Sequence, residues 1–195
     1  QIISEPGKPP YSPLVYYHPF GPAGQILLRR TQLKNIEPIG VVGLGAGSLA
    51  WYAASGQKIE FFEIDPMVAR IASNKKLFTY LPECKGEYHI KLGDARTNLK
   101  QEPDSKFGIL ILDAFSSDAI PVHLLTKEAI QTFVTKLQDD GVLLFHISNR
   151  HLDLRPQLNA VAKELGLIAL VQNQGKDKIS EREAKSGLAP SMWVI

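Results

Sequence analysis

This sequence has little cysteine and little excess of charge. Cys84 is the single cysteine in 195 residues, so the chain can form no internal disulfide and no thiolate metal cluster of its own. We therefore expect a reducing compartment and predict a cytoplasmic location. Lysine and arginine total 22 against 20 aspartate and glutamate residues, a net charge of +2. This balance provides no basic stripe, so nucleic acid is not an expected partner.

Long apolar runs and clusters of metal ligands are missing as well. No run approaches the roughly 18 residues that cross a bilayer, and the first residues lack the charged-then-apolar pattern of a signal peptide. We expect no direct membrane contact in this segment. The histidines show no ligand spacing, which predicts no metal site. They are His18, His89, His123, His146 and His151.

The N-terminal stretch QIISEPGKPPYSP is rich in proline, glycine and serine, which is typical of a linker or an extended arm. We predict an N-terminal arm or linker over residues 1–38 and one α/β domain over residues 39–195. The chain begins with Gln1 instead of methionine, which suggests a segment of a longer protein.

Residues 39–65 place a glycine-rich turn between two apolar runs. The first run, residues 39–42, suits a strand buried on both faces, and Gly43, Gly45 and Gly47 then allow a tight turn and close approach to a ligand. A helix is expected to start at Ser48. The second strand, residues 59–64, ends at an acidic pair, where a carboxylate can accept hydrogen bonds from ribose hydroxyls. The pattern predicts a nucleotide-binding βαβ unit.

The spacing of the glycines distinguishes between cofactor classes. A dinucleotide fingerprint needs G-x-G-x-x-G, whereas here the third glycine comes one residue early and Ser48 occupies its place. This argues against NAD. The form G-x-G-x-G followed by E-x-D is similar to the motif of class I S-adenosylmethionine folds, whose ligand has no phosphate to hold.

The rest of the chain alternates strand and helix patterns, which predicts a doubly wound, mostly parallel α/β sheet. Expected strands cover residues 88–92, 107–115, 141–147 and 192–195, and expected helices start at Pro66 or cover residues 124–137 and 154–165. Residues 172–190 are polar with little periodicity and are expected to form a mobile loop.

Several polar positions should meet at one edge of this sheet, because ligands bind beyond the carboxyl ends of parallel strands. These positions are Gly43, Glu63, Asp94, Asp113 and the segment 146–149.

With these landmarks the chain resembles the spermidine synthase family of aminopropyltransferases over roughly residues 16–170. The resemblance rests on YH at 17–18, GLGAG at 43–47, EID at 63–65, GDA at 93–95 and DAFSSDAIP at 113–121. More narrowly, it is similar to bacterial spermidine-synthase-like proteins, some fused to membrane transporters, that carry YYH, GQ, DAFS and HISNR.

The resemblance implies a Rossmann-like class I S-adenosylmethionine-dependent methyltransferase fold and S-adenosylmethionine, or its decarboxylated form, as co-substrate. It implies that the three glycines line the nucleoside pocket, Glu63 holds the ribose, Asp94 with the adjacent Ala95 meets the adenine, and Asp113 faces the reacting centre. Tyr17, His18 and Gln25 would fold over the pocket, although packing of these residues against the sheet is equally open. A homodimer is also left open.

Aminopropyl transfer needs a base, because an alkylamine with a pKa near that of lysine, about 10.4, is almost wholly protonated at pH 7. Asp113 can hold the amine and accept its proton. Asp118 could bind the second cationic end, with the hydroxyls of Ser116 and Ser117 orienting it. We therefore predict Asp113 and Asp118 as the catalytic pair.

Two departures from the family keep other functions open. The family's two aspartates lie three apart in a D-x-x-D-P run, whereas Asp113 and Asp118 are five apart and no Asp-Pro follows. The usual N-terminal β-domain has too little room in 38 residues. Methyl transfer to a small molecule and a non-catalytic nucleoside-binding module remain alternatives.

The acidic residues also have structural interpretations. Glu63 and Asp65 could cap the following helix, and Asp94 could be a turn residue. Asp113 could serve the fold alone, and Asp118 could belong to a plain loop.

Overall fold

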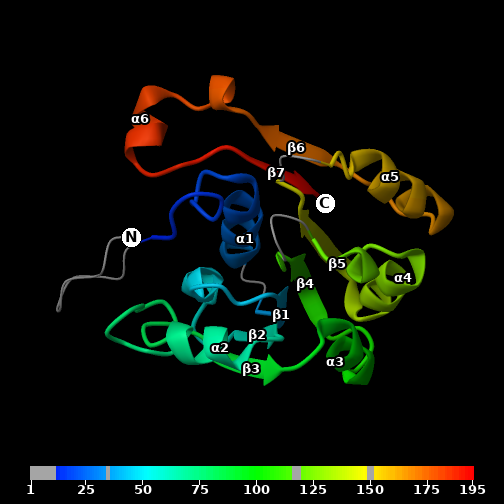
Figure 1. The fold of residues 1–195 in the computed structure, drawn as a ribbon, viewed down its shortest axis with the longest axis horizontal. Coiled ribbons are helices and arrows are strands. Elements are labelled where there is room, and N and C mark those ends of the chain that lie inside the picture. Colours follow the sequence, from blue (N-terminus) through cyan, green and yellow to red (C-terminus); the bar gives the residue numbers. More distant parts are fainter. Residues whose placement is uncertain (1–11, 34–35, 116–119, 149–151) are drawn as a thin grey trace.

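The computed structural model describes residues 12–33, 36–115, 120–148 and 152–195. Within these residues seven strands form one sheet in the order β3-β2-β1-β4-β5-β7-β6 (Figure 1). The strands are β1 (Ile39–Val42), β2 (Lys58–Glu63), β3 (Glu87–Leu92), β4 (Phe107–Leu112), β5 (Leu137–His146), β6 (Val171–Gln174) and β7 (Ser191–Val194). Neighbours from β3 to β5 run parallel, and β7 is antiparallel to both β5 and β6.

The helices are α1 (Pro22–Gln32), η1 (Ser48–Tyr52), α2 (Pro66–Ala72), α3 (Ala95–Gln101), η2 (Val122–Leu124), α4 (Lys127–Thr135), α5 (Arg155–Glu164), η3 (Lys176–Lys178) and α6 (Glu181–Lys185). Alternate residues of a buried strand point to opposite faces of the sheet, and helices cover both faces. Ile109 and Ile111 of β4 pack in one cluster with residues of α1, η1 and α2, whereas Leu110 and Leu112 pack in another with residues of α3, α4 and α5. This confirms the prediction of a doubly wound, mostly parallel α/β sheet.

Helix α1 lies inside the predicted N-terminal arm. Ala23 and Leu27 of α1 are buried in the same cluster as Ile39 and Val41 of β1. The helix therefore covers one face of the sheet. The predicted domain boundary at residue 38 stays a prediction.

One local prediction holds in part and another is wrong. A helix begins at Ser48 as expected, but it is the short 3₁₀ helix η1, which ends at Tyr52 because Ala53 adopts an extended backbone. The loop expected over residues 172–190 contains β6 and α6 instead. The backbone of β6 pairs with β7, and a capping box of Ser180 and Glu183 starts α6, so neither element needs a strong apolar pattern.

The parallel strands bring their carboxyl ends to one edge. Gly43 follows β1, Glu63 ends β2, Asp113 follows β4 and His146 ends β5. None of the helices in the described ranges is both long enough and apolar enough to cross a membrane.

Candidate active site

The glycine-rich loop between β1 and η1 depends on close backbone packing. Gly43 has a φ of 93°, and a Cβ there would lie 2.6 Å from the carbonyl oxygen of Asp113. Gly47 has a φ of 76°, and a Cβ there would lie 2.7 Å from Cγ of Leu81. A larger residue would therefore push the loop away from Asp113 at position 43 and away from Leu81 at position 47.

Glu63 anchors this loop. Its buried carboxylate accepts the N–H of Leu44 at 2.9 Å on Oε2 and the N–H of Asp65 at 2.8 Å on Oε1. A carboxylate offers about four acceptor sites, so both oxygens retain lone pairs for a ligand. Asp65 is the residue that caps α2, because its side chain accepts the N–H of Met67 at 2.7 Å.

Asp94 caps α3 and also faces solvent at the same edge. Its Oδ1 accepts the N–H of Thr97 at 2.8 Å, and Oδ2 lies 3.5 Å from Nε2 of His123. Burial raises the pKa of the Asp94 carboxyl, but hydrogen bonds from Thr97 and the nearby His123 outweigh this and lower it. Asp94 is therefore a capping residue whose ionised side chain stays available to a ligand.

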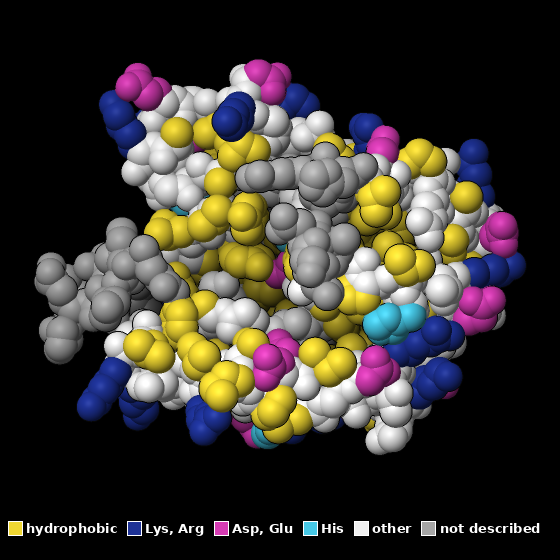
Figure 2. All heavy atoms as spheres, in the orientation of Figure 1, with side chains coloured by type: hydrophobic (Ala, Val, Ile, Leu, Met, Phe, Trp, Pro, Cys, Tyr) yellow, Lys and Arg dark blue, Asp and Glu magenta, His cyan; other side chains and the backbone are white. Residues whose placement is uncertain are grey.

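These residues surround a cavity of about 690 Å³, which we term the glycine-loop cavity. Figure 2 shows this face of the molecule hollowed near its centre, with hydrophobic side chains around the hollow. The predicted residues that line the cavity are Tyr17, Gly43, Gly45, Glu63, Asp94, Ala95 and Asp113.

Asp113 uses each carboxylate oxygen for a different partner. Oδ2 accepts a hydrogen bond from the hydroxyl of Tyr17 at 2.5 Å, and Oδ1 lies 2.7 Å from Nδ1 of His146. Burial and the neighbouring Asp113 carboxylate raise the pKa of the Tyr17 hydroxyl well above its usual value, so this group is a stable donor. Asp113 thus links the N-terminal segment to the end of β5.

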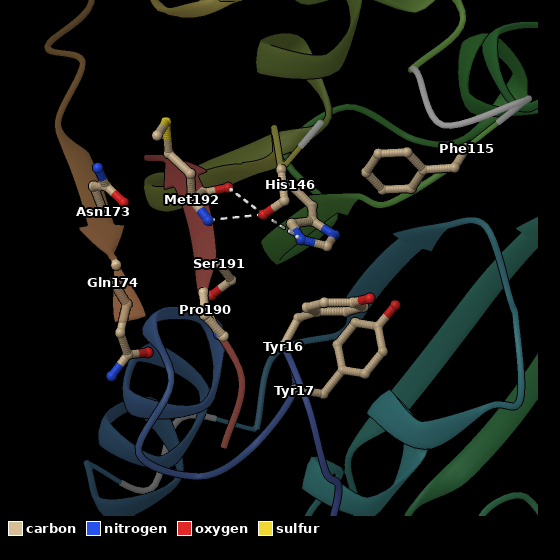
Figure 3. Close-up of a pocket in the computed structure, with 11 residues that line it drawn as sticks. Tyr16, Tyr17, Phe115, His146, Asn173, Gln174, Pro190, Ser191 and Met192 are labelled. Atoms are coloured by element: carbon tan, nitrogen blue, oxygen red, sulfur yellow. Dashed lines mark hydrogen bonds between the residues drawn. The ribbon is translucent and has the colours of Figure 1, made fainter. Parts of the chain in front are cut away.

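His146 connects Asp113 to a second cavity. Its Nε2 lies 2.9 Å from Oγ of Ser148, and its ring stacks on Trp193 of β7 at 4.4 Å between centroids. The second cavity, of about 650 Å³, lies beside β7 and is termed the β7 cavity. It shares Tyr17 and Phe115 with the glycine-loop cavity. Figure 3 shows His146 between Phe115 and the tyrosine rings, with Asn173 and Gln174 across the cavity on β6.

Three predicted residues lie away from both linings. The ring nitrogens of His18 contact the N–H of Phe20 at 3.2 Å and Oγ of Ser186 at 3.2 Å, and burial lowers the pKa of this imidazole. Gln25 donates to the carbonyl of Phe20 at 2.7 Å. Gly47 lies under Leu81. The predicted Asp118, with Ser116 and Ser117, lies outside the described residues.

Sequence reasoning did not assign roles to most residues of the β7 cavity. His146 falls in the segment 146–149 that was expected at the sheet edge. Its position at the end of a predicted strand was therefore the signal that could have identified it. Asn173 and Gln174 had no signal, because their strand was mistaken for a loop. In the described part of the chain, no group of three or more His, Cys, Asp or Glu side chains is placed to hold a metal ion.

Comparisons with known proteins agree with this architecture. No family model matches the chain. A polyamine aminopropyltransferase of Vibrio vulnificus is 34% identical over 113 residues, which cover 55% of this chain and 36% of that protein. The chain thus spans about a third of the length of this curated relative.

Two solved structures share the fold. Human methyltransferase-like protein 13 in complex with SAH has a TM-score of 0.62 at 21% identity, covering 88% of this chain and 78% of that one. Spermidine synthase from Thermotoga maritima has a TM-score of 0.57 at 16% identity, and the match covers 82% of this chain and 53% of that one. The chain therefore has the Rossmann-like class I S-adenosylmethionine-dependent methyltransferase fold, which confirms the fold prediction. The resemblance to spermidine synthases is likewise confirmed.

Proposed function

We propose that this chain binds an S-adenosylmethionine-type nucleoside in the glycine-loop cavity and transfers an alkyl group from its sulfonium to an acceptor. The observation that carries the proposal is the convergence of Gly43, Glu63, Asp94 and Asp113 on one cavity. These residues come from the ends of β1, β2, β3 and β4, so the sheet alone brings them together.

The donor set of the cavity fits such a nucleoside. Free lone pairs on Glu63 suit the two ribose hydroxyls, and the partly exposed, ionised Asp94 suits an amino group on the adenine. Gly45 has no atom within 4 Å of an added Cβ, so the loop leaves open space for a ligand edge. The carboxylate of Asp113 supplies the negative charge that a sulfonium favours.

Aminopropyl transfer from decarboxylated S-adenosylmethionine to an amine is the first candidate. It is supported by the 34% identity to an aminopropyltransferase and by the buried Tyr17–Asp113 pair beside the cavity. Methyl transfer is the second candidate. It is supported by the TM-score of 0.62 to human methyltransferase-like protein 13, which was solved in complex with SAH.

Calorimetric titration with S-adenosylmethionine, its decarboxylated form and methylthioadenosine tests the proposal. Binding of at least one nucleoside is expected, and no heat with any of them at millimolar concentration would overturn it. Tenfold tighter binding of the decarboxylated form, about 1.4 kcal/mol, favours aminopropyl transfer, and the reverse preference favours methyl transfer. Binding without consumption of any acceptor would favour a non-catalytic module.

A further inference from the structure

The hydrogen bonds around His146 assign its tautomer. Oδ2 of Asp113 accepts the hydroxyl hydrogen of Tyr17, and with Oδ1 as the second acceptor, Nδ1 of His146 carries the hydrogen and donates it over 2.7 Å. Nε2 is then the nitrogen with the free lone pair. It points to Ser148 Oγ, 2.9 Å away, at the wall of the β7 cavity.

Ser148 is oriented to donate to that lone pair. Its Oγ already accepts the N–H of Met192 at 2.8 Å, and its other acceptor, the carbonyl of Met192, is more distant at 3.5 Å. The hydroxyl hydrogen is therefore directed at Nε2 of His146. Ser148, His146 and Asp113 form an ordered chain of the kind that makes an imidazole an effective base.

The same cavity contains buried polar atoms without a partner. Oγ of Ser191, a residue only 4% exposed, and Oε1 of Gln174 make no hydrogen bond in the structure. Both residues line the β7 cavity, and such atoms are costly unless a ligand or water satisfies them. They indicate a ligand that brings hydrogen-bond donors.

We propose that the β7 cavity is the acceptor site and that His146, through Ser148, is the base of the transfer reaction. This inference rests on the proposed function. The acceptor it fits is a primary alkylamine with a second amino group. The rings of Tyr16, Tyr17 and Phe115 suit an alkylammonium, and Gln174 and Ser191 accept its distal hydrogens.

The proton passes from the substrate ammonium through Ser148 to His146. An N–H of the entering ammonium gives its proton to Oγ of Ser148, which passes its own proton to Nε2 of His146, while Asp113 stabilises the resulting imidazolium. The neutral nitrogen attacks the carbon bound to the sulfonium sulfur, and an N–C bond forms. The C–S bond breaks with its electron pair left on sulfur, giving a neutral thioether nucleoside and a secondary ammonium. The histidine later releases one proton to solvent. Asp113 is thus a positioning residue behind His146.

The test uses His146→Gly, with His89→Gln as matched control because His89 is exposed on β3 and contacts only Glu87 among its described ion pairs. Release of methylthioadenosine is measured with decarboxylated S-adenosylmethionine and saturating putrescine, cadaverine or spermidine. We expect His146→Gly to lower turnover by about 10²- to 10⁴-fold. Added imidazole should restore at least a tenth of the lost rate, and His89→Gln should keep the wild-type rate. Unchanged turnover, or a folded variant that imidazole does not rescue, would overturn the role of His146.

Two variants of Ser148 test the same relay if His146→Gly does not fold. Ser148→Ala should lose at least tenfold in turnover, whereas Ser148→Thr, which keeps the hydroxyl, should retain it. Equal rates in the two variants would refute the relay. Nucleoside affinity measured by calorimetry distinguishes failure of the proposed function from failure of the acceptor assignment. If the wild-type chain binds no nucleoside, the proposed function fails. If it binds nucleoside but transfers to none of the three amines, only the acceptor assignment fails.

Discussion

The carboxylate of Asp113 makes two hydrogen bonds that require an acceptor at both oxygens, to Tyr17 and to His146. In Asp113→Asn the amide nitrogen must face one of these two donors, so the tautomer of His146 is no longer held. We expect turnover to fall by about two to four orders of magnitude while nucleoside affinity stays within a few-fold of wild type. Steady-state kinetics beside calorimetry would show this split. Loss of the folded circular-dichroism spectrum would instead favour a structural role.

Glu63 is the residue through which the loop and the nucleoside are coupled. A glutamine at this position would turn an N–H₂ group toward the N–H of Leu44 or of Asp65 and would lose the charge that strengthens its bonds to ribose. Glu63→Gln should weaken nucleoside binding by about 1–3 kcal/mol. Calorimetric dissociation constants give the comparison, with the exposed Glu87→Gln on β3 as control. Equal affinity in both variants would show that Glu63 does not touch the ligand.

At the scale of elements, a partly buried ion cluster ties β2, β3 and the segment between α3 and β4 together. Lys91 contacts Glu60 at 2.8 Å and also Glu102, while Lys106 contacts Glu60 at 2.5 Å and Glu102 at 2.7 Å. The side chains of Glu60 and Glu102 are 7% and 9% exposed. Each lysine contacts both carboxylates, so removal of Glu102 would leave Lys91 and Lys106 to share the single buried carboxylate of Glu60.

This cluster predicts a pH dependence of stability. Burial raises the pKa of the Glu102 carboxyl, but hydrogen bonds and charges from Lys106 and Lys91 outweigh it and lower the pKa below its ordinary 4.5. A depressed folded-state pKa contributes stability above the unfolded value, and this contribution is lost as the pH falls through the folded value. The urea midpoint of the wild type should therefore drop over roughly pH 5 to 3.

Glu102→Gln isolates this effect. The variant should be less stable than wild type at pH 7 and show a flatter midpoint over the same acidic range. Glu181→Gln on α6 is the matched control, since its ion pair with Lys185 is exposed on both sides and should matter little. Parallel curves for wild type and Glu102→Gln would contradict the assignment.

At the scale of the whole molecule, a nucleoside that contacts the ends of four strands should stabilise the entire sheet. Ligand at 100 times its dissociation constant adds about 2.7 kcal/mol. For a chain of this size that corresponds to a rise in Tm of about 5–11 °C. Differential scanning fluorimetry with S-adenosylmethionine and its decarboxylated form measures the rise. NAD is the control and should give none, because η1 is too short to offer a pyrophosphate the helix N-terminus that dinucleotides use.

The local pattern of apolar residues and glycines was enough to predict the buried strands and the turn that follows the first of them. Strands β1 and β4 are apolar because both of their faces are buried, and β2 places Ile59, Phe61 and Phe62 in the core. The glycines follow β1 because the turn there requires left-handed backbone. Their parallel order then places Gly43, Glu63, Asp94 and Asp113 at one edge. For this reason the sequence predicted the sheet and most of the glycine-loop cavity.

Pairings between distant residues were decided only by the tertiary structure. Tyr17 meets Asp113 across 96 residues, and His146 meets it across 33, in contacts that no local periodicity records. The edge strand β6 was missed because its backbone pairing with β7 does not depend on apolar side chains. His18, which the motif placed beside Tyr17 at the pocket, turns instead to Ser186. Sequence spacing determines which residues can reach an edge of the sheet, whereas burial and hydrogen-bond satisfaction in three dimensions decide which of them face each other.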